Sequence, residues 1–409
     1  MSMNILSTIH IEQTIAAGLD GLELAGKRVL LIVPDGTRSA PMPLLFGMVH
    51  RLLAERGARM DAIIALGTHQ PMTRAAIERH LGVALDALEH DGTQIFNHQW
   101  EDPATFVSLG TIAAERVAAI SGGMLAESVE VRVNKLALEY DRLLICGPVF
   151  PHEVVGFSGG NKYLFPGIGG QAIIDLSHWL GALITSYAII GTPGTTPVRA
   201  LIDAAAALIP TPKSCIAMVV HPGTDDLDGI WIDTPELAWE RAAALAAEVH
   251  VRYLERPYRR VLAIIPPMYP EIWTAAKGMY KLEPVVAEGG ELVVYAPHIR
   301  EFSATHGAAL ARIGYHTRDY FLANWETFGH EPRGVIAHST HLRGIGSMVD
   351  GVERPRIAVT LATSIDAARC AAHSIGYRDP ASIDIGAWRA DPETLVVDHA
   401  GEQLYRLRP

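Results

Sequence analysis

The chain has 409 residues, of which 49% are hydrophobic and 19% are charged, and its formal net charge is −11 with histidine neutral. This length exceeds what one simple core supports, so we expect two domains in a globular protein. The acidic balance and the lack of a basic stripe argue against a nucleic-acid partner. A small anion remains possible as a ligand, because local lysines and arginines decide that.

Cysteine usage and the N-terminal sequence indicate a cellular compartment. Cys146, Cys215 and Cys370 are far apart and form no CxxC pair. We therefore expect neither a disulfide framework nor a thiolate metal site, and Cys146 reads as a small buried hydrophobe. The N-terminal stretch lacks a cationic region and contains Glu12, and the apolar runs are too short to cross a bilayer. These features predict a cytoplasmic protein with no signal peptide and no membrane span.

Short apolar runs alternate with amphipathic helical patterns through the first part of the chain. We predict strands over residues 27–33, 61–66, 141–146 and 214–220, and helices over 43–56, 73–81, 172–180 and 198–208. This repetition of strand, loop and helix is typical of parallel α/β sheets.

A second domain is predicted to begin near residue 257. Strands are expected over residues 259–265, 291–296 and 356–361, with a helix beginning within 271–278. The predicted fold class is therefore α/β, with two α/β domains, mostly parallel sheets and an active-site crevice between the domains. The predicted domains are residues 1–256 and 257–409.

Several polar residues directly follow predicted strands. Asp35, Arg38, His69, His152 and Lys162 all occupy such positions. Ligands of open parallel sheets bind beyond the carboxyl ends of the strands. We therefore expect these side chains to converge on one crevice, although the sequence does not show which strands are neighbours.

The glycine-rich segment 148–181 is the strongest functional signal in the sequence. It carries His152, Lys162 and His178, with six glycines between residues 156 and 170, and follows a predicted strand and leads into a predicted helix. Such a loop lets backbone N–H groups approach an anion, while lysine can neutralise a phosphate or act as a nucleophile. Histidine can move protons or bind a metal. The alternative is a crossover loop with surface histidines.

The spacing within this segment carries a family resemblance. The pattern His-x3-Gly-Phe-Ser-Gly-Gly-x-Lys runs from His152 to Lys162, and His178 follows sixteen residues later. The chain resembles the lactate racemase family, whose enzymes use a nickel-pincer nucleotide. The segments 33–38 and 67–69 extend the resemblance, which covers essentially the whole chain, more firmly before residue 200 than after residue 300.

The resemblance implies a set of cofactor ligands in the first domain. Lys162 would attach the pincer covalently as a thioamide, and His178 would ligate nickel, although residues 176–180 also look like an ordinary amphipathic helix. The other implied cofactor contacts are Asp35, Thr37, Ser158, Gly159, Gly160 and Gly169. Enzymes of cofactor synthesis would then be required as maturation partners.

The same resemblance implies the reaction. His69 and His152 would be the two acid/base histidines of a racemase or epimerase acting on a small 2-hydroxy acid. Arg38 would anchor the substrate carboxylate together with Lys277 of the second domain. The implied mechanism is a hydride shuttle, in which the Cα hydrogen passes to the cofactor pyridinium and returns on the other face.

The chain departs from the family's name-giving enzyme in the second domain. That enzyme has Gln three residues before the position of Lys277, whereas this chain has Thr274, which we expect to contact substrate. We cannot place its C-terminal active-site Trp, and we find instead the polar cluster His338-Ser-Thr-His-Leu-Arg343. We therefore predict a substrate larger or more polar than lactate.

Two other functions remain open on the sequence. A hydrolase could bind a divalent metal through His69, His152 and His178, but this leaves Lys162 unexplained. A non-catalytic protein could bind or deliver the cofactor, but this leaves the paired histidines without a role.

Overall fold

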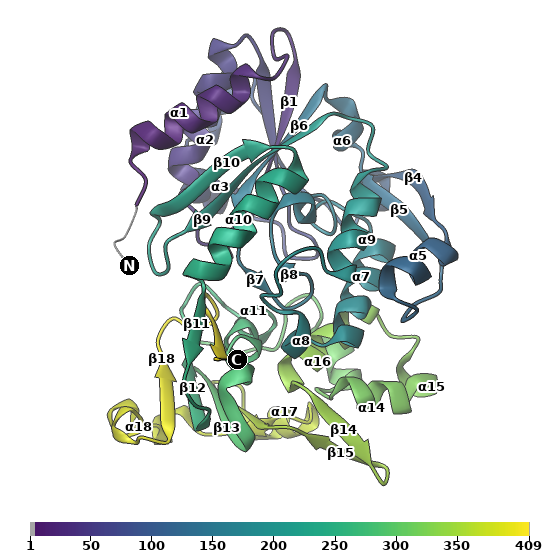
Figure 1. Cartoon of the computed structure of the whole chain (residues 1–409), viewed down its shortest axis with the longest axis vertical. Helices are drawn as coiled ribbons and strands as arrows, with labels where there is room; N and C mark the ends of the chain where they lie inside the picture. Colours follow the sequence, from purple (N-terminus) through teal and green to yellow (C-terminus); the bar gives the residue numbers. More distant parts are fainter. Residues whose placement is uncertain (1–4, 409) are drawn as a thin grey trace. The chain divides into compact units, whose positions relative to one another are not determined.

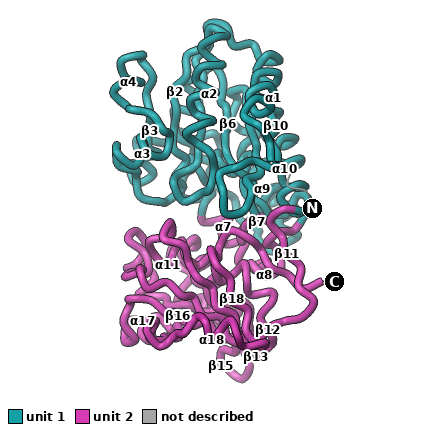
Figure 2. Tube along the Cα trace, turned by 90° about the vertical axis from the view of Figure 1, so that its left-hand side faces the viewer, with its two compact units in different colours: residues 1–150, 157–174, 193–248 teal, residues 151–156, 175–192, 249–409 magenta. Residues whose placement is uncertain are grey.

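A computed structural model describes residues 5–408, which form two compact units (Figure 2). The first unit contains the chain up to residue 150 and residues 157–174 and 193–248; the second contains residues 151–156 and 175–192 and the chain from residue 249 onward. The start of this last segment lies close to the predicted boundary at 256/257. The two short segments differ from the prediction, because they place His152 and His178 in the second unit.

The first unit is built on a six-stranded sheet with the order β10-β9-β6-β1-β2-β3. Its strands are β1 (Arg28–Val33), β2 (Arg59–Ile64), β3 (Ile95–Asn97), β6 (Arg142–Pro148), β9 (Lys213–Val220) and β10 (Leu227–Asp233). Neighbouring strands are parallel except for β9 and β10. The predicted α/β class is confirmed, and so are the four predicted strands of this region.

Burial of the central strand on both faces explains its sequence. Five of the six residues of β1 are buried, as expected for a parallel strand covered on both sides. One face packs against α1 (Thr8–Asp20) and α2 (Met42–Glu55), where Leu31 shares a core with Ile15 and Val49 (Figure 1). Helix α1 begins at the cap Ser7, whose hydroxyl accepts from the His10 N–H.

The remaining helices of this unit follow the expected local signals. The predicted helix 73–81 is α3 (Arg74–Leu81), capped by Thr73 and ended by Gly82 in the left-handed conformation. The others are α4 (Leu85–His90), α5 (Ala114–Ser121), α6 (Leu136–Glu139), α9 (Pro197–Ala206) and α10 (Pro235–Val249), with 3-10 turns η1 (Pro103–Thr105) and η2 (Gly160–Tyr163). Strands β4 (Phe106–Ile112) and β5 (Val129–Asn134) form a separate antiparallel pair.

The second unit has its own five-stranded parallel sheet, with the order β17-β16-β13-β12-β18. Its strands are β12 (Tyr258–Ile264), β13 (Val286–Ala296), β16 (Ala358–Thr363), β17 (Gly376–Tyr377) and β18 (Thr394–Val397). The three strands predicted for this domain correspond to β12, β13 and β16. Two smaller sheets pair β11 (Val251–Leu254) with β19 (Leu404–Leu407), and β14 (Gly346–Val349) with β15 (Val352–Pro355).

Short helices surround this second sheet. The helix predicted within 271–278 consists of two single turns, α11 (Ile272–Ala275) and α12 (Lys277–Tyr280). The others are α8 (Ser186–Ile189), α13 (Gly307–Ile313), α14 (Arg318–Ala323), α15 (Trp325–Phe328), α16 (Arg333–Arg343), α17 (Ala367–Ala372) and α18 (Ile385–Ala390), with 3-10 turns η3 (Glu283–Val285) and η4 (Pro380–Ser382). Helix α7 (Gln171–Ile184) begins in the first unit and ends in the second. The chain changes unit again at residues 150/151 and 156/157, next to the two-residue strands β7 (Pro151–His152) and β8 (Gly156–Phe157).

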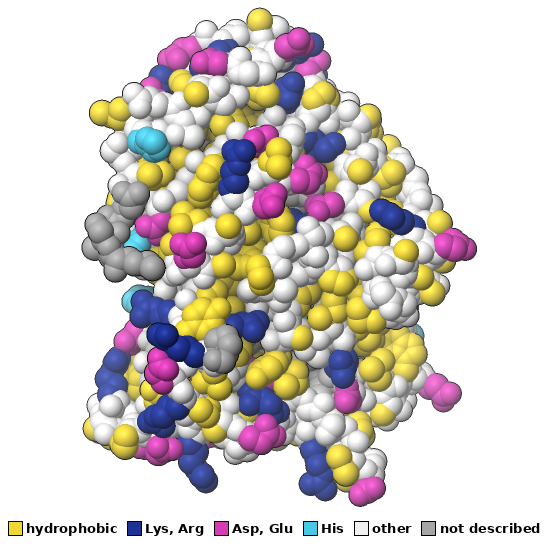
Figure 3. Space-filling view, viewed as in Figure 1, with side chains coloured by type: hydrophobic (Ala, Val, Ile, Leu, Met, Phe, Trp, Pro, Cys, Tyr) yellow, Lys and Arg dark blue, Asp and Glu magenta, His cyan; other side chains and the backbone are white. Residues whose placement is uncertain are grey.

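The surface charges and Cys146 can be compared with the expectations from the sequence. Acidic and basic side chains are interspersed over the face shown in Figure 3. The thiol of Cys146 is buried, and burial raises its pKa to about 12. Within residues 5–408, no helix is both long and apolar enough to cross a bilayer.

A glycine in the central sheet provides a test of packing in the first unit. A Cβ at Gly147 of β6 would lie 2.2 Å from the hydroxyl oxygen of Tyr163 in η2. We predict that Gly147→Ala lowers the free energy of unfolding by about 1–3 kcal/mol, as overpacking does in a dense core. Urea unfolding measures the change.

The matched control is Gly47→Ala on the exposed side of α2, where a Cβ meets nothing within 4 Å. This variant should be unchanged or more stable by up to about 1 kcal/mol, because alanine is the better helix former. Equal stabilities of the two variants would contradict the packing argument.

Candidate active site

Two predicted site loops leave the same edge of the first unit's sheet. Strands β1 and β2 are adjacent and parallel, with Val33 opposite Ile64. The loops after their carboxyl ends carry Asp35 and His69, and Nδ1 of His69 lies 2.5 Å from Oδ2 of Asp35. The expected convergence of these two residues is therefore confirmed, because the strand order makes their loops neighbours.

The Asp35 carboxylate is buried and fully engaged by its neighbours. Its Oδ1 accepts from the backbone N–H and the hydroxyl of Thr37, at 3.0 and 2.7 Å. Burial by itself raises the pKa of Asp35, but the charge and hydrogen bond of His69, with Arg38 and Thr37, hold this pKa far below its usual range. An ionised Asp35 therefore accepts from Nδ1 of His69 and orients the imidazole.

The loop that carries His69 is also fixed through its backbone. The indole N–H of Trp100 donates to the His69 carbonyl at 2.9 Å. The Gly67 N–H donates to the carbonyl of Gly167, also at 2.9 Å, and so connects this loop to the glycine-rich segment. The acid/base candidate and the cofactor-loop candidate are thus joined within one unit.

Three glycines of the predicted cradle are required by close packing. Gly159 and Gly160 have φ of 86° and 57°, and Cβ atoms there would approach Val149 at 2.6 Å and Trp239 at 2.9 Å. A Cβ at Gly169 would lie 2.7 Å from the Phe165 ring. These positions therefore have a packing role, whatever the loop binds.

A buried arginine holds this loop by hydrogen bonds to its carbonyls, and this residue was not predicted from the sequence. Arg199 of α9 is 1% exposed, and its guanidinium donates to the carbonyls of Gly159 at 3.0 Å and Phe157 at 2.6 Å. It also lies over the ring of Trp239, whose indole N–H donates to the Ser158 carbonyl at 2.9 Å. In the sequence, Arg199 looks like one polar residue of an amphipathic helix, and no signal distinguishes it.

Further contacts hold the turn that carries Lys162. The amide of Asn161 donates to Asp203 at 2.9 Å and to Glu236 at 2.7 Å. The hydroxyl of Ser158 accepts from the Phe150 N–H at 2.9 Å. Lys162 is half-buried, whereas every other residue from 151 to 170 except Glu153 is buried. The loop is therefore rigidly packed, with the lysine among its few accessible side chains.

The second unit contains the other predicted acid/base histidine. Nδ1 of the buried His152 lies 3.1 Å from Oε2 of Glu153, and the Val154 N–H donates to the same nitrogen at 3.2 Å. His152 therefore has a carboxylate next to Nδ1, as His69 has. The sequence analysis did not identify Glu153, although it is the adjacent residue.

His178 lies on α7 within the second unit. It is half-buried, and its Nδ1 is 3.4 Å from the hydroxyl oxygen of Ser177. Helix α7 is fixed at this point, because Oδ1 of Asp175 accepts from the Gly334 N–H at the start of α16, at 2.8 Å. Trp179 stacks on Trp325 with ring centroids 4.9 Å apart. The imidazole is therefore presented from a well-anchored helix.

The predicted substrate residues of the second unit follow strand β12. The hydroxyl of Thr274 donates to the Glu271 carbonyl at 3.1 Å, so its hydrogen is used within its own turn. The half-buried Lys277 has Nζ 4.5 Å from the centroid of the Tyr269 ring. At the end of α16, the guanidinium of Arg343 donates to the Ser374 carbonyl at 3.2 Å.

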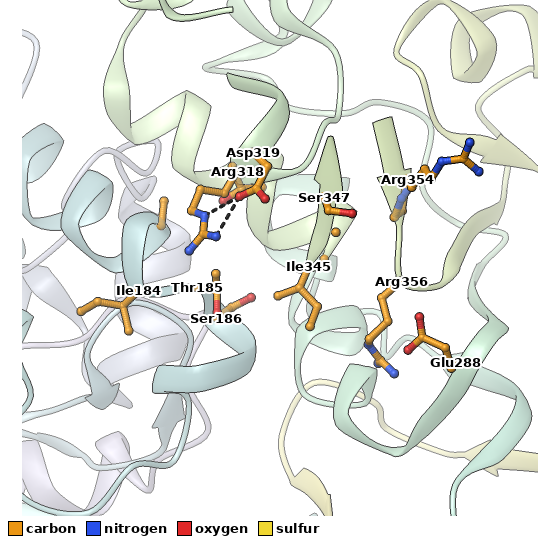
Figure 4. Close-up of a pocket in the computed structure, with 15 residues that line it drawn as sticks. Ile184, Thr185, Ser186, Glu288, Arg318, Asp319, Ile345, Ser347, Arg354 and Arg356 are labelled. Atoms are coloured by element: carbon orange, nitrogen blue, oxygen red, sulfur yellow. Dashed lines mark hydrogen bonds and ion pairs between the residues drawn. The ribbon is translucent and has the colours of Figure 1, made fainter. Parts of the chain in front are cut away.

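A cavity of about 630 Å³ also lies in the second unit, between α8, α14 and the β14–β15 pair (Figure 4). Arg318 is paired with Asp319 at 2.8 Å and donates to the Leu183 carbonyl, while Arg356 donates to the Val286 carbonyl at 2.8 Å. These two guanidinium groups are bound to oxygens of the protein. No predicted site residue lines the cavity.

The predicted residues thus form two groups. The first unit holds Asp35, Thr37, Arg38, His69, Ser158, Gly159, Gly160, Lys162 and Gly169, and the second holds His152, His178, Thr274 and Lys277. That both groups line one crevice stays a prediction. Within residues 5–408, no three His, Cys, Asp or Glu side chains cluster in a way that could hold a metal ion.

Comparison with known proteins identifies relatives of part of the chain. The family described as "Lactate racemase N-terminal domain" matches residues 10–190. The lactate racemase of Thermoanaerobacterium thermosaccharolyticum is 29% identical over 185 residues, which are 44% of this chain and 39% of that protein. The lactate racemase of Lactiplantibacillus plantarum is 28% identical over 162 residues, 39% of this chain and 34% of that protein. The matched segments therefore span well under half of either relative.

Solved structures extend the similarity to the whole chain. A protein from Thermotoga maritima has 31% sequence identity and a TM-score of 0.92, and the match covers 99% of both chains. The lactate racemase apoprotein from Thermoanaerobacterium thermosaccharolyticum has a TM-score of 0.72 at 17% identity, over 97% of this chain and 92% of that one, which shows a shared fold. Residues 10–190 thus match the lactate racemase family, and the whole chain shares the fold of the lactate racemase apoprotein.

Proposed function

We propose that this protein is a racemase or epimerase of a 2-hydroxy acid that works with a nickel-pincer nucleotide. The observation that carries the proposal is the repeated pairing of an imidazole with a carboxylate. Nδ1 of His69 faces Asp35 and Nδ1 of His152 faces Glu153. The match of residues 10–190 to the lactate racemase family supports a racemase-type reaction, and the two histidines supply the acid/base groups that such a reaction needs.

The proposal assigns His69 and His152 to opposite enantiomers of the same substrate. A racemase must take and return the hydroxyl proton on either side of the reacting carbon. An imidazole has a pKa suited to this exchange near neutral pH. Nδ1 of His69 is engaged by Asp35, so Nε2 exchanges the proton, as in other histidines that a carboxylate orients. Nδ1 of His152 accepts from the Val154 N–H, so this imidazole also presents Nε2, with the Glu153 carboxylate nearby. Asp35 thus serves His69, in place of the cofactor contact that the family resemblance implies.

The residues around the glycine-rich loop fit the proposed cofactor. Lys162 offers a half-buried amine in a rigid loop, and His178 offers a half-buried imidazole, a donor that suits nickel. Lys162 would hold the nucleotide covalently and His178 would bind the metal, with Ser158, Gly159, Gly160, Gly169 and Thr37 around the rest of the group. When bound, the nucleotide supplies a pyridinium that accepts the Cα hydrogen with its electron pair and returns it.

Two cations are assigned to the substrate carboxylate. Arg38 is half-buried beside the Asp35–His69 pair, and a guanidinium binds carboxylates in a bidentate way. Lys277 provides an ammonium group in the second unit. Thr274 stays a proposed substrate neighbour, and because its hydroxyl already donates to Glu271, it would shape the site rather than donate to the substrate.

The two alternative functions account for fewer of these features. A hydrolase with a histidine-bound metal gives no role to Lys162 in its rigid turn. A cofactor-delivery protein has no need of two imidazoles oriented for proton transfer.

The covalent attachment is tested by mass spectrometry of protein made together with enzymes of pincer synthesis. The peptide that contains Lys162 should carry the nucleotide adduct, and Lys162→Arg should carry none and be inactive. Lys27→Arg, at an exposed lysine, is the control and should keep both adduct and activity. Full activity in protein shown to lack adduct and nickel would end this proposal.

The fate of the Cα hydrogen tests the reaction type. We predict that racemisation in D2O places no deuterium at Cα, and that Cα-deuterated substrate keeps its label. The hydrogen then leaves with its electron pair, so the histidines exchange only the hydroxyl proton. NMR of the product decides between the two routes. Stoichiometric deuterium at Cα would indicate direct proton abstraction instead.

The Asp35–His69 pair is tested through stability. At pH 7, Asp35→Asn should lower the free energy of unfolding by about 1–3 kcal/mol, because it removes a buried ionised hydrogen-bond acceptor. The folded-state pKa of Asp35 lies below the unfolded value of about 3.9. Its contribution is therefore fully present above about pH 4 and is lost as the pH falls through the folded-state pKa.

Urea unfolding between pH 7 and pH 3 should show the difference between wild type and variant shrink only below about pH 4. The exposed Asp20→Asn is the control and should change stability by less than about 0.5 kcal/mol. If Asp35→Asn were as stable as wild type at pH 7, the pair would not have the strength that we assign to it.

A further inference from the structure

Helix α16 carries two buried imidazoles on one face. His338 and His341 are 7% and 3% exposed, and residues three apart lie side by side on a helix. Within residues 5–408, Nε2 of His338 and both ring nitrogens of His341 have no hydrogen-bond partner. Buried polar atoms are normally paired, because an unpaired one keeps the full cost of its desolvation. These nitrogens therefore need an explanation.

Aromatic rings hold His338 in place without giving it a hydrogen bond. Its ring stacks on Trp273 with centroids 4.0 Å apart and planes 27° apart, and it meets Tyr315 edge-on at 6.0 Å. Trp273 also lies 4.2 Å from the ring of His306. Trp273 directly precedes Thr274 in α11, so the stack joins His338 to the turns that carry the proposed substrate residues.

The same helix lies beside the other proposed site residues of the second unit. The Gly334 N–H ties α16 to Asp175, three residues before His178 on α7. His341 lies in the field of Glu153, the carboxylate next to His152. Helix α12, which begins at Lys277, packs against α16. The helix that carries the unpaired nitrogens therefore contacts the helices that carry His178 and Lys277.

The charge state of the pair limits what it can bind. Burial lowers the pKa of His341 to about 4, although the Glu153 carboxylate acts in the opposite direction. A neutral imidazole offers one donor and one acceptor, so it suits a hydroxyl group and cannot balance a carboxylate. Arg343, which the sequence suggested as part of this cluster, donates to the Ser374 carbonyl. The face of the helix that carries His338 and His341 therefore presents neutral hydrogen-bonding groups.

We infer that His338 and His341 bind the part of the hydroxy acid beyond its reacting carbon, and that this part carries uncharged hydroxyl groups. The substrate class is then a polyhydroxy acid rather than a simple alkyl hydroxy acid or a dicarboxylate. An alkyl chain would leave the imidazole nitrogens unpaired, and a second carboxylate would meet no cation on this helix face. This inference rests on the proposed function and specifies its substrate.

Three four-carbon acids test the inference because they differ only beyond the reacting carbon. 2-Hydroxybutyrate has an alkyl chain there, erythronate has two hydroxyls and malate has a carboxylate. Calorimetric titration of the cofactor-loaded protein should show that erythronate binds at least about tenfold more tightly than the other two, since tenfold corresponds to about one buried hydrogen bond. The same order is expected in kcat/KM.

Substitution of His338 separates substrate binding from folding. His338→Phe keeps a ring for the stack and should lose the preference for erythronate, while binding of 2-hydroxybutyrate changes less than about threefold. Its melting temperature should stay the same or rise, because an unpaired polar nitrogen has been removed. His338→Gln, which keeps a donor and an acceptor, should retain part of the preference.

His373→Phe is the matched control. His373 is also buried and ring-stacked, on Phe302 at 3.9 Å, but its Nδ1 is paired with the Arg369 carbonyl at 2.8 Å. This variant should melt at a lower temperature and keep the preference for erythronate. A purely structural role for His338 would give that result in His338→Phe as well, and would overturn the inference.

The outcomes distinguish this inference from the proposed function. Tight binding of erythronate that depends on His338, without nickel-dependent conversion, would support the binding site and contradict the racemase proposal. Conversion of 2-hydroxybutyrate or malate with the highest kcat/KM, unaffected by His338→Phe and by His341→Phe, would support the racemase proposal and overturn the inference.

Discussion

The buried guanidinium of Arg199 holds the glycine-rich loop, and the position of Lys162 depends on that loop. Burial lowers the pKa of Arg199 to about 10, so the group remains charged at neutral pH. Its two terminal nitrogens donate to the Gly159 and Phe157 carbonyls, and its face lies over Trp239. A charge buried in this way must be paired with well-placed oxygens. To place these carbonyls, the backbone turns at residues 159 and 160 with positive φ, a conformation that glycine adopts easily.

Each of the two proposed acid/base histidines has a carboxylate next to Nδ1, but only His69 is hydrogen-bonded to it, because Nδ1 of His152 accepts from the Val154 N–H. One carboxylate comes from the loop after a neighbouring strand, as Asp35 does for His69, and the other comes from the adjacent residue, as Glu153 does for His152. In each case the acid faces Nδ1. The electrostatic arrangement is therefore a property of each unit alone, which lets each imidazole be oriented before any substrate binds.

The second unit contrasts two kinds of buried polar group. Arg318 and Arg356, which line the cavity in Figure 4, are paired with protein oxygens, so they stabilise the fold. The imidazoles of His338 and His341 instead keep unpaired nitrogens at a cost to stability. A fold can retain such a cost where function benefits from it. The difference in pairing, rather than the number of polar groups, separates these two regions.

The sequence by itself determined the elements and the family motif. Continuous apolar runs identified β1, β6, β9 and β12, and the spacing from His152 through Lys162 to His178 carried the resemblance. These signals are local, because side-chain periodicity and motif spacing depend only on neighbours along the chain. Strand order, the partner of Asp35, the burial of Arg199 and the assignment of His152 and His178 to the second unit were decided only by the tertiary structure. Each depends on contacts between residues far apart in sequence, which no local pattern records.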